Sequence, residues 1–363
     1  MTSAPRWTEL SVQNFRGLSD LRLEGLGTFN VLFGANDVGK TSVLEGIFLL
    51  SGLGNLELPI RIQNFRNFIV PDIEGLGLLV HGLDPNSHAT LEAHAADGSK
   101  RTLELSTPRD ASIVERDPPP TPDHRPSQSA FSTPSDRRIV RYSGSVRPSD
   151  LDDPIEFSGT LKVNNDGFER HIDPAHASEY ILPARYLAPN ASYDAKLISD
   201  VAVHKRIVDL VECLQMINPA ITNITSDGNL AYADIGLSQM LPLNMLGTGM
   251  SRAAAMIAPC ILDNSRILLV DELENGLHHR AIPQLLGTLL RVSYERSIQV
   301  FVTTHSRTVL EELYSVLARE ECRLYRAGSS SYALQRAQSG MIGTYRYGYS
   351  DLEYALKHEI EIR

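Results

Sequence analysis

Apolar and polar residues alternate through residues 7–26 and then give way to a continuous apolar run, Phe29–Phe33. Alternation with a period of two is typical of antiparallel strands with one buried face, and a short apolar run is typical of a fully buried strand. From Lys40 onward the apolar residues take a helical spacing, which Gly52 and Gly54 end. The pattern therefore predicts strands, a buried strand, a glycine-containing loop and a helix, in that order.

The pattern changes between about residues 76 and 195. HATLEAHAADGSKRTLELS predicts a hairpin that turns at DGS, and IEFSGTLKVNNDGFERHI resumes the strand pattern with a turn at NNDG. Between them, residues 114–137 are rich in proline and polar residues, which predicts a surface loop or a disordered insertion. We therefore expect a small β-rich lobe inserted into the main domain.

The later part of the chain returns to helical patterns. Residues 200–217 are amphipathic with a period near 3.6 and predict one helix with a core-facing apolar stripe. That stripe consists of Val201, Ile207, Val208, Val211 and Leu214. Helical and strand patterns alternate from residue 246 to about 326, which completes an α/β arrangement. The predicted segments are an N-terminal lobe at 1–75, the insertion at 76–195, a C-terminal lobe at 196–330 and a C-terminal tail at 331–363.

Composition and charge narrow the class of protein. The 363 residues are 42% hydrophobic and 21% charged, as in an ordinary globular protein, and the net charge of -10 argues against coating of nucleic acid, although a local basic groove remains possible. Cys213, Cys260 and Cys322 are far apart, which favours a reducing cytosol over a disulfide framework or a zinc site. The N-terminus lacks a signal-peptide pattern, and no apolar run approaches the roughly 18 residues that span a bilayer. We therefore expect a soluble cytoplasmic protein without a membrane partner.

The segment GANDVGKT, from Gly34 to Thr41, matches GxxxxGK[ST] and lies between the buried strand and the helix. In such a loop successive backbone N–H groups point at phosphate oxygens, Lys40 reaches the β- and γ-phosphates, and the Thr41 hydroxyl can ligate Mg²⁺. The predicted nucleotide-binding residues of this segment are Gly34, Ala35, Asn36, Asp37, Val38, Gly39, Lys40, Thr41 and Ser42. By itself the loop leaves kinases, GTPases and many ATPases open.

A pair of carboxylates follows a second buried run, Ile267–Val270, which predicts a central parallel strand. Asp271 comes at the carboxyl end of that strand, where ligands bind in an open α/β sheet, and suits Mg²⁺ held directly or through water. Glu272 could orient and deprotonate an attacking water, which a hydrolase needs and a kinase does not. The alternative is that DELE only begins a solvated helix. His278 and His279 have no third ligand nearby and predict the start of a surface helix rather than a metal site.

A histidine ends the next apolar strand, Val300–Val302, in the segment TTHS. At the carboxyl end of a strand in the same sheet, His305 could hydrogen-bond the γ-phosphate or the attacking water. The alternative is a structural histidine. Three strand-end polar groups in one sheet favour the functional interpretation.

A glycine turn precedes an alanine-rich helix and contains Gly247, Thr248, Gly249 and Ser251. Exposed N–H and hydroxyl donors at a helix N-terminus form an anion site. Because a nucleotide held by the phosphate loop needs no second cradle in the same subunit, the turn predicts two subunits that meet head to tail. Each turn would then close on the γ-phosphate of the partner. An ordinary helix cap is the alternative.

The order of these motifs resembles that of ATP-binding-cassette-type ATPase heads, most closely the SMC, RecF and OLD-like branch, often called AAA family ATPases. VQNFRGLSDLRL is similar to the N-terminal strand of that branch, VDELENGLH to its extended Walker B and D-loop, and TTHS to its H-loop. The resemblance covers roughly residues 8–50 and 240–310. It implies an α/β P-loop NTPase with an ABC-type head, a mixed sheet flanked by helices.

The resemblance also implies roles for single residues. Lys40 and Thr41 would carry phosphate and Mg²⁺, with Asp271 also on Mg²⁺. Glu272 would be the catalytic base and His305 the switch histidine.

Three further positions are related to the family pattern less directly. Arg16, in NFRG, would lie near the nucleotide. Gln63 is a candidate for the Q-loop glutamine. The signature loop reads LGTG, with Gly247 where the family usually has serine, which leaves the strength of the contact with the partner open.

The resemblance implies a stand-alone head. The 58 residues after His305 are too few for a Toprim nuclease domain, and no heptad repeat predicts an SMC-type arm. The implied function is an ATPase that binds ATP and Mg²⁺, forms a homodimer on ATP and controls DNA or a separate effector protein, as in bacterial DNA repair or anti-phage defence. A nucleotide-binding scaffold with little hydrolysis is the alternative, and a phosphotransferase is disfavoured.

A local basic stretch is the candidate DNA contact. It consists of Arg137, Arg138, Arg141 and Arg147, with Tyr142 among them. Such residues could make a phosphate contact or two. A solvated loop is the alternative.

Overall fold

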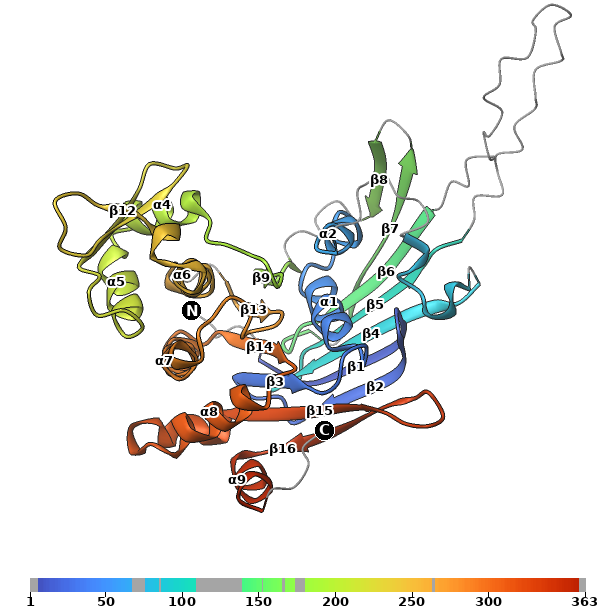
Figure 1. The fold of residues 1–363 in the computed structure, drawn as a ribbon. Helices are drawn as coiled ribbons and strands as arrows, with labels where there is room; N and C mark the ends of the chain where they lie inside the picture. Colours follow the sequence, from blue (N-terminus) through green and yellow to red (C-terminus); the bar gives the residue numbers. More distant parts are fainter. Residues whose placement is uncertain are drawn as a thin grey trace, which may run out of the picture.

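The computed structural model describes residues 6–66, 76–84, 86–108, 139–151, 153–164, 167–173, 180–262 and 265–358. The predicted loop at 114–137 lies outside these residues, as do Arg137 and Arg138. The described chain forms two large sheets with helix α1 (Lys40–Ser51) between them, and further helices cover the outer face of one sheet (Figure 1).

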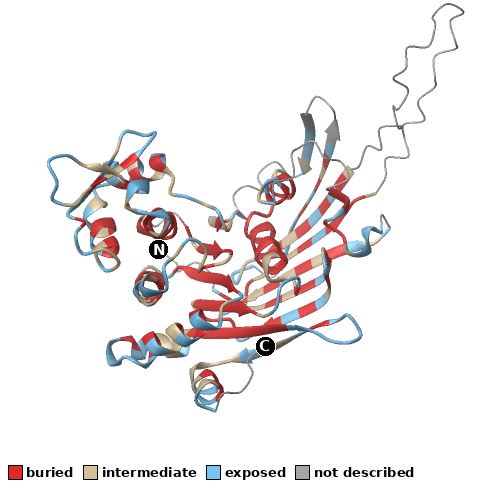
Figure 2. Cartoon of the chain, viewed as in Figure 1, coloured by how far each residue is buried: buried red, intermediate tan, exposed pale blue. Residues whose placement is uncertain are grey.

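The first sheet is antiparallel, with its strands in the order β2-β1-β4-β5-β6-β7-β8. Its strands are β1 (Trp7–Phe15), β2 (Leu18–Glu24), β4 (His88–Ala95), β5 (Lys100–Ser106), β6 (Ile139–Arg147), β7 (Ile155–Asn164) and β8 (Gly167–Asp173). Buried and more exposed residues alternate along the strands, so that one face packs on α1 and the other meets solvent (Figure 2). The hairpin predicted at DGS joins β4 to β5.

The β-rich segment predicted after residue 76 is joined directly to the N-terminal strands. β4 pairs with β1 along a register that runs from Trp7 opposite Ala95 to Gln13 opposite Thr90. The predicted boundary at residue 76 therefore falls inside one sheet. The pairing covers the edge that β1 would otherwise expose, and unpaired edges are unfavourable for a lone hairpin.

The second sheet has the order β16-β15-β3-β14-β13-β9. Its strands are β3 (Phe29–Phe33), β9 (Ala184–Leu187), β13 (Ile267–Val270), β14 (Gln299–Thr304), β15 (Ser329–Arg336) and β16 (Ile342–Tyr347). Every neighbouring pair is parallel except β15 with β16. β3, β13 and β14 are buried along their whole length, as their continuous apolar runs predict.

The C-terminal segment differs from the expected tail. β15 pairs in parallel with β3, and β16 completes the edge of the sheet before α9 (Tyr349–Lys357). The buried residues Tyr332, Ala333 and Leu334 of β15 belong to the core. An apolar run of this length does not show from its pattern alone whether the segment is a buried strand or an exposed tail.

Helices cover the face of the second sheet that α1 does not (Figure 1). They are α4 (Ala195–Val203), α5 (Ile207–Gln215), α6 (Thr248–Ile261), α7 (Ile282–Glu295) and α8 (Arg307–Ala318). A small sheet of β10 (Asn223–Ser226), β11 (Ala231–Asp234) and β12 (Leu241–Pro242) packs beside α4 and α5. The short helix α2 (Leu58–Asn64) follows α1.

The single helix predicted over residues 200–217 was wrong. The chain forms α4 and α5 instead, and Lys205 between them has a φ of 59°, outside the helical region. Val201, Val211 and Leu214 are buried, whereas Val208 is 61% exposed. The break rotates the second helix, so one apolar stripe cannot continue through both.

The structure separates the residues of the basic stretch that it describes. Tyr142 is 2% exposed and faces the core of the first sheet, while Arg141 and Arg147 are exposed. Because side chains alternate along a strand, β6 places the tyrosine and these arginines on opposite faces.

Candidate active site

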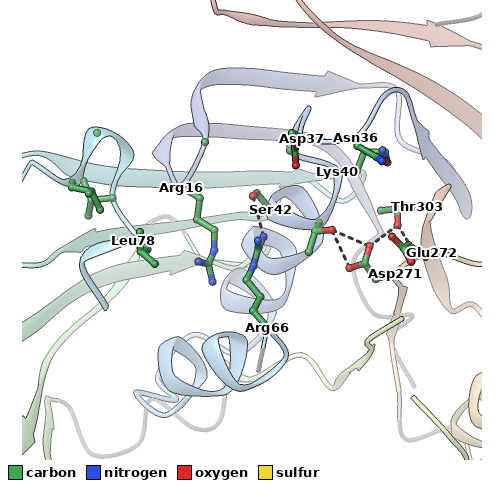
Figure 3. Close-up of a pocket in the computed structure, with 16 residues that line it drawn as sticks. Arg16, Asn36, Asp37, Lys40, Ser42, Arg66, Leu78, Asp271, Glu272 and Thr303 are labelled. Carbon is green, nitrogen blue, oxygen red and sulfur yellow. Dashed lines mark hydrogen bonds between the residues drawn. The ribbon is translucent and has the colours of Figure 1, made fainter. Parts of the chain in front are cut away.

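A cavity of about 700 Å³ opens at the carboxyl ends of β13 and β14, beside the loop that follows β3 (Figure 3). It brings together residues that are far apart in the sequence. The predicted residues that line it are Arg16, Asn36, Asp37, Gly39, Lys40, Thr41, Ser42, Asp271 and Glu272. Ligands bind at this edge in open α/β sheets.

The backbone of the phosphate loop requires both of its glycines. Gly34 has a φ of 143° and Gly39 a φ of 87°. A Cβ at Gly34 would lie 2.4 Å from the carbonyl oxygen of Leu334, and one at Gly39 would lie 2.5 Å from a methyl carbon of Leu18. The loop is therefore clamped between β15 and β2, with space only for hydrogen at these two positions.

Lys40 lies folded over the loop that it follows. Its Nζ donates hydrogen bonds to the carbonyl oxygens of Gly34 and Ala35, at 2.9 and 2.8 Å. Burial lowers the pKa of Lys40 from its ordinary value, and nearby carboxylates, Asp271 first among them, oppose that shift. The ammonium group is thus held where it can meet an anion in the loop.

Asp271 is a buried carboxylate, 3% exposed, surrounded by hydroxyl groups. Thr303 Oγ1 donates to its Oδ1 at 2.6 Å, and the Tyr186 hydroxyl donates to its Oδ2 at 3.2 Å. Thr41 Oγ1 lies 3.1 and 3.0 Å from the two carboxylate oxygens (Figure 3). The adjacent oxygens of Thr41 and Asp271 are donors of the kind that Mg²⁺ takes.

Glu272 occupies a strained backbone position with a φ of 49°. Its N–H donates to Thr303 Oγ1 at 2.8 Å, and the guanidinium of Arg252 donates to the carbonyl oxygens of Asp271 and Glu272 at 2.6 and 2.8 Å. These bonds fix the turn, and the side chain lines the cavity next to Thr303 (Figure 3).

Sequence analysis did not predict several residues of the site. Thr303 contacts both carboxylate residues, although the sequence indicated only a polar end to its strand. Arg66, at the end of α2, lines the cavity together with Arg16, and both pair with the buried Glu45 of α1. A single glutamate inside an otherwise apolar helix was the available signal for this cluster.

Gln63 lies behind the cavity wall. It is 3% exposed, and its Oε1 accepts from the Arg16 guanidinium at 3.4 and 3.5 Å. It does not line the cavity, whereas Arg66, three residues later, does.

His305 does not line the cavity that contains Asp271. It lines a neighbouring hollow with Gly34, Ala35 and Val38, and Asn36 lines both spaces. Its Nδ1 is 3.2 Å from Glu274 Oε1, and its side chain is half-exposed. The third strand-end group therefore pairs with Glu274 and lies outside the cavity lined by the two carboxylates.

The predicted glycine turn does not line the cavity of its own chain. Helix α6 begins at Thr248, whose hydroxyl donates to the carbonyl oxygen of Gly276 at 3.0 Å. Gly247 and Thr248 are exposed, but Ser251 is only 5% exposed and lies below the turn. Arg252, one residue further along α6, joins the helix to the Asp271–Glu272 turn.

Residues 29–311 match the family model described as "AAA domain, putative AbiEii toxin, Type IV TA system". The chain belongs to this family. It is 20% identical over 372 residues to an "ATP/GTP phosphatase" of Helicobacter pylori, covering 96% of this chain and 97% of the relative. A "DNA replication and repair protein RecF" of Acinetobacter baumannii is 50% identical over 44 residues, 12% of each protein.

Solved structures show the same fold. An SMC head bound to the C-winged helix domain of ScpA aligns with a TM-score of 0.50 at 12% identity, covering 97% of this chain and all of that one. An SMC head with an extended coiled coil, bound to the C-terminal domain of ScpA derived from Pyrococcus furiosus, aligns with a TM-score of 0.51 at 10% identity, covering 98% of this chain and 99% of that one. With its motifs and family, the chain is an ABC-type ATPase head of the SMC/RecF-like branch, and it hydrolyses ATP.

The described residues hold no group of three or more His, Cys, Asp and Glu side chains that could bind a metal ion by themselves. His278 and His279 stand at the start of the 3-10 helix at His279–Ala281, with their rings 4.2 Å apart. Among all the residues that the structure describes, no helix has the length and apolar character needed to cross a membrane.

Replacing Thr303 with valine is expected to lower the kcat for ATP hydrolysis by about tenfold or more. The change keeps the shape of the side chain but removes a donor to Asp271 and an acceptor for the Glu272 N–H, and buried polar groups left unpaired cost roughly 1–3 kcal/mol each. Steady-state phosphate release measures the effect. Thr303→Ser, which keeps the hydroxyl, is the matched control, and equal rates for both variants would contradict this role.

Proposed function

We propose that the protein is a Mg²⁺-dependent ATP switch that forms a homodimer when ATP binds and separates after hydrolysis. The observation that carries the proposal is the glycine turn at Gly247–Gly249. The turn is accessible and lies outside the cavity of its own chain, yet it packs on the segment that follows the catalytic carboxylates. A second copy could present this turn to the nucleotide.

The cavity can perform hydrolysis with its own side chains. Lys40 binds the β- and γ-phosphates, and the loop N–H groups hold the chain of phosphates. Thr41 and Asp271 would hold Mg²⁺, which neutralises negative charge on the phosphate oxygens. Glu272 accepts a proton as water attacks the γ-phosphorus, the bond to the β–γ bridging oxygen breaks, and ADP and phosphate leave.

His305 is placed for a different task from Glu272. Its half-exposed side chain lines a hollow with Gly34 and Ala35, and it does not line the cavity of Asp271. We propose that it meets the γ-phosphate only after Glu274 releases it, when the dimer closes. This makes it a switch residue rather than part of the resting site.

The proposed dimer has a direct test. With Glu272→Gln to slow hydrolysis, ATP is expected to convert the protein from monomer to dimer in analytical ultracentrifugation, while ADP leaves it monomeric. Adding Gly249→Glu should prevent the dimer, because a carboxylate at the turn repels the γ-phosphate. Ser143→Glu on the exposed face of β6 makes the same charge change in the first sheet and is the control.

A monomer in ATP would contradict the proposal, as would a dimer that survives Gly249→Glu. Duplex DNA in the same experiment distinguishes the two outputs that we propose, DNA or a separate effector protein in bacterial DNA repair or anti-phage defence. Co-sedimentation with the ATP-bound dimer supports DNA. The names of the relatives that match part of this chain, RecF among them, support this direction.

A further inference from the structure

Glu45 is a charged residue in the centre of a buried helix. It belongs to α1, one helical turn after Thr41, and its side chain is fully buried. An isolated buried carboxylate is strongly unfavourable, so its partners decide its role. Those partners are Arg16, whose Nε lies 2.5 Å from one carboxylate oxygen, and Arg66, whose Nε and Nη2 lie 2.7 and 3.1 Å from the two oxygens.

The cluster has more positive than negative charge. Two guanidinium groups share one carboxylate, and Arg16 also donates to the neutral amide of Gln63. Arg16 is almost fully buried, while the Arg66 side chain is 35% exposed. Both line the ATP cavity, so this wall presents more positive than negative charge to it. Such a charge favours an anion in the cavity.

The position of Arg66 is fixed from its backbone outward. The neighbouring Phe65 stacks on Tyr186, with ring centroids 4.5 Å apart and planes 3° from parallel. Tyr186 in turn donates to Asp271 through its hydroxyl. The aromatic pair therefore ties the end of α2 to the carboxylate side of the cavity, and Glu45 fixes the direction of the guanidinium.

The geometry points to Arg66 as a nucleotide-binding residue, with Glu45 as its positioning residue; this rests on the proposed function of the cavity. Arg66 Nη2 lies 3.5 Å from Ser42 Oγ, whereas Thr41 beside it faces Asp271 (Figure 3). In the proposed function, the γ-phosphate and its metal ion bind next to Thr41 and Asp271. The α-phosphate, which is nearest to the nucleoside, then lies on the side of the cavity where Ser42 is. Arg66 therefore contacts the part of the chain that ATP and ADP share.

Equilibrium binding of ATP and of ADP by isothermal titration calorimetry tests the contact. Arg66→Ala is expected to weaken both ligands by about 10- to 100-fold, as for loss of a charge-assisted hydrogen bond. Arg61→Ala is the matched control, since Arg61 lies in the helix α2 that precedes Arg66 and pairs at the surface with Glu57. That variant is expected to bind as the wild type does.

Glu45→Gln tests whether Glu45 acts by positioning Arg66 or only through its negative charge. Removing a negative charge would by itself strengthen binding of an anion, whereas loss of the positioning contact weakens it. We expect about tenfold weaker binding of ATP and ADP, with little further loss when Arg66→Ala is added, because both changes remove one contact. If Glu45→Gln does not fold, Arg66→Ala still tests whether Arg66 binds the nucleotide. In that variant Glu45 keeps its ion pair with Arg16.

The outcomes separate this inference from the function on which it rests. Tighter binding by Glu45→Gln, or unchanged binding by Arg66→Ala, overturns the inference when Lys40→Ala still abolishes ATP binding. A loss confined to ATP overturns the placement at the shared phosphates. Unchanged binding by Lys40→Ala would instead overturn the nucleotide site itself.

Discussion

Lys40→Ala is expected to weaken ATP binding by at least about 100-fold and to abolish hydrolysis. The ammonium group donates to the carbonyl oxygens of Gly34 and Ala35, and in such a loop the lysine reaches the β- and γ-phosphates. Loss of a charge-assisted contact to a multiply charged anion in a partly buried site accounts for an effect of this size. Calorimetry measures the affinity, and phosphate release measures the rate.

Stability provides the control for this prediction. Since the Lys40 side chain bonds only within its own loop, the melting temperature without ligand is expected to stay close to that of the wild type. Saturating ATP stabilises the wild type by binding the native state, roughly 2.7 kcal/mol at 100 times Kd, and this gain should vanish in the variant. Lys100→Ala, in the first sheet, should keep it. A variant that ATP still stabilises would refute the role of Lys40.

Glu272→Gln is expected to lower kcat by about 100- to 10,000-fold and to leave ATP affinity nearly unchanged. The amide keeps the shape and the backbone bond to Thr303 but cannot accept the proton of the attacking water. Rapid-quench measurement of ADP in a single turnover separates the chemical step from product release, and calorimetry gives the affinity.

Glu274→Gln is the comparison, because Glu274 is only two residues away and faces Thr304 and His305 instead of the cavity. We expect a much smaller loss there. Equal losses in the two variants would mean that the turn, rather than the Glu272 carboxylate, carries the chemistry.

Local sequence predicted most of the chemical groups of this site. The strand–loop–helix order around Gly34 and Thr41, and the carboxylates after a buried strand, depend on residues close together in the chain. Periodicity and a short motif are sufficient to detect them. For the same reason the apolar strands β3, β13 and β14 were predicted from their own residues, and β13 was also predicted to be parallel.

Contacts between distant segments could not be predicted in this way. The pattern of β6 identified a strand but not which face would hold Tyr142, and the 200–217 stripe gave no sign of the break at Lys205. Likewise, a strand-end histidine indicates an edge of a sheet but not the direction of its ring, which Glu274 sets in His305.

By itself, then, the sequence determined that this protein has a glycine loop after one buried strand and a pair of carboxylates after another on an α/β sheet, and it predicted a phosphate, metal and base role for them. Only the tertiary structure decided that β4 joins β1, that β15 completes the sheet beside β3, and that Glu45 gathers two arginines at the cavity. The physical reason is that periodicity reports which face of a segment is buried, whereas the partner that buries it is selected by packing and charge across the whole chain.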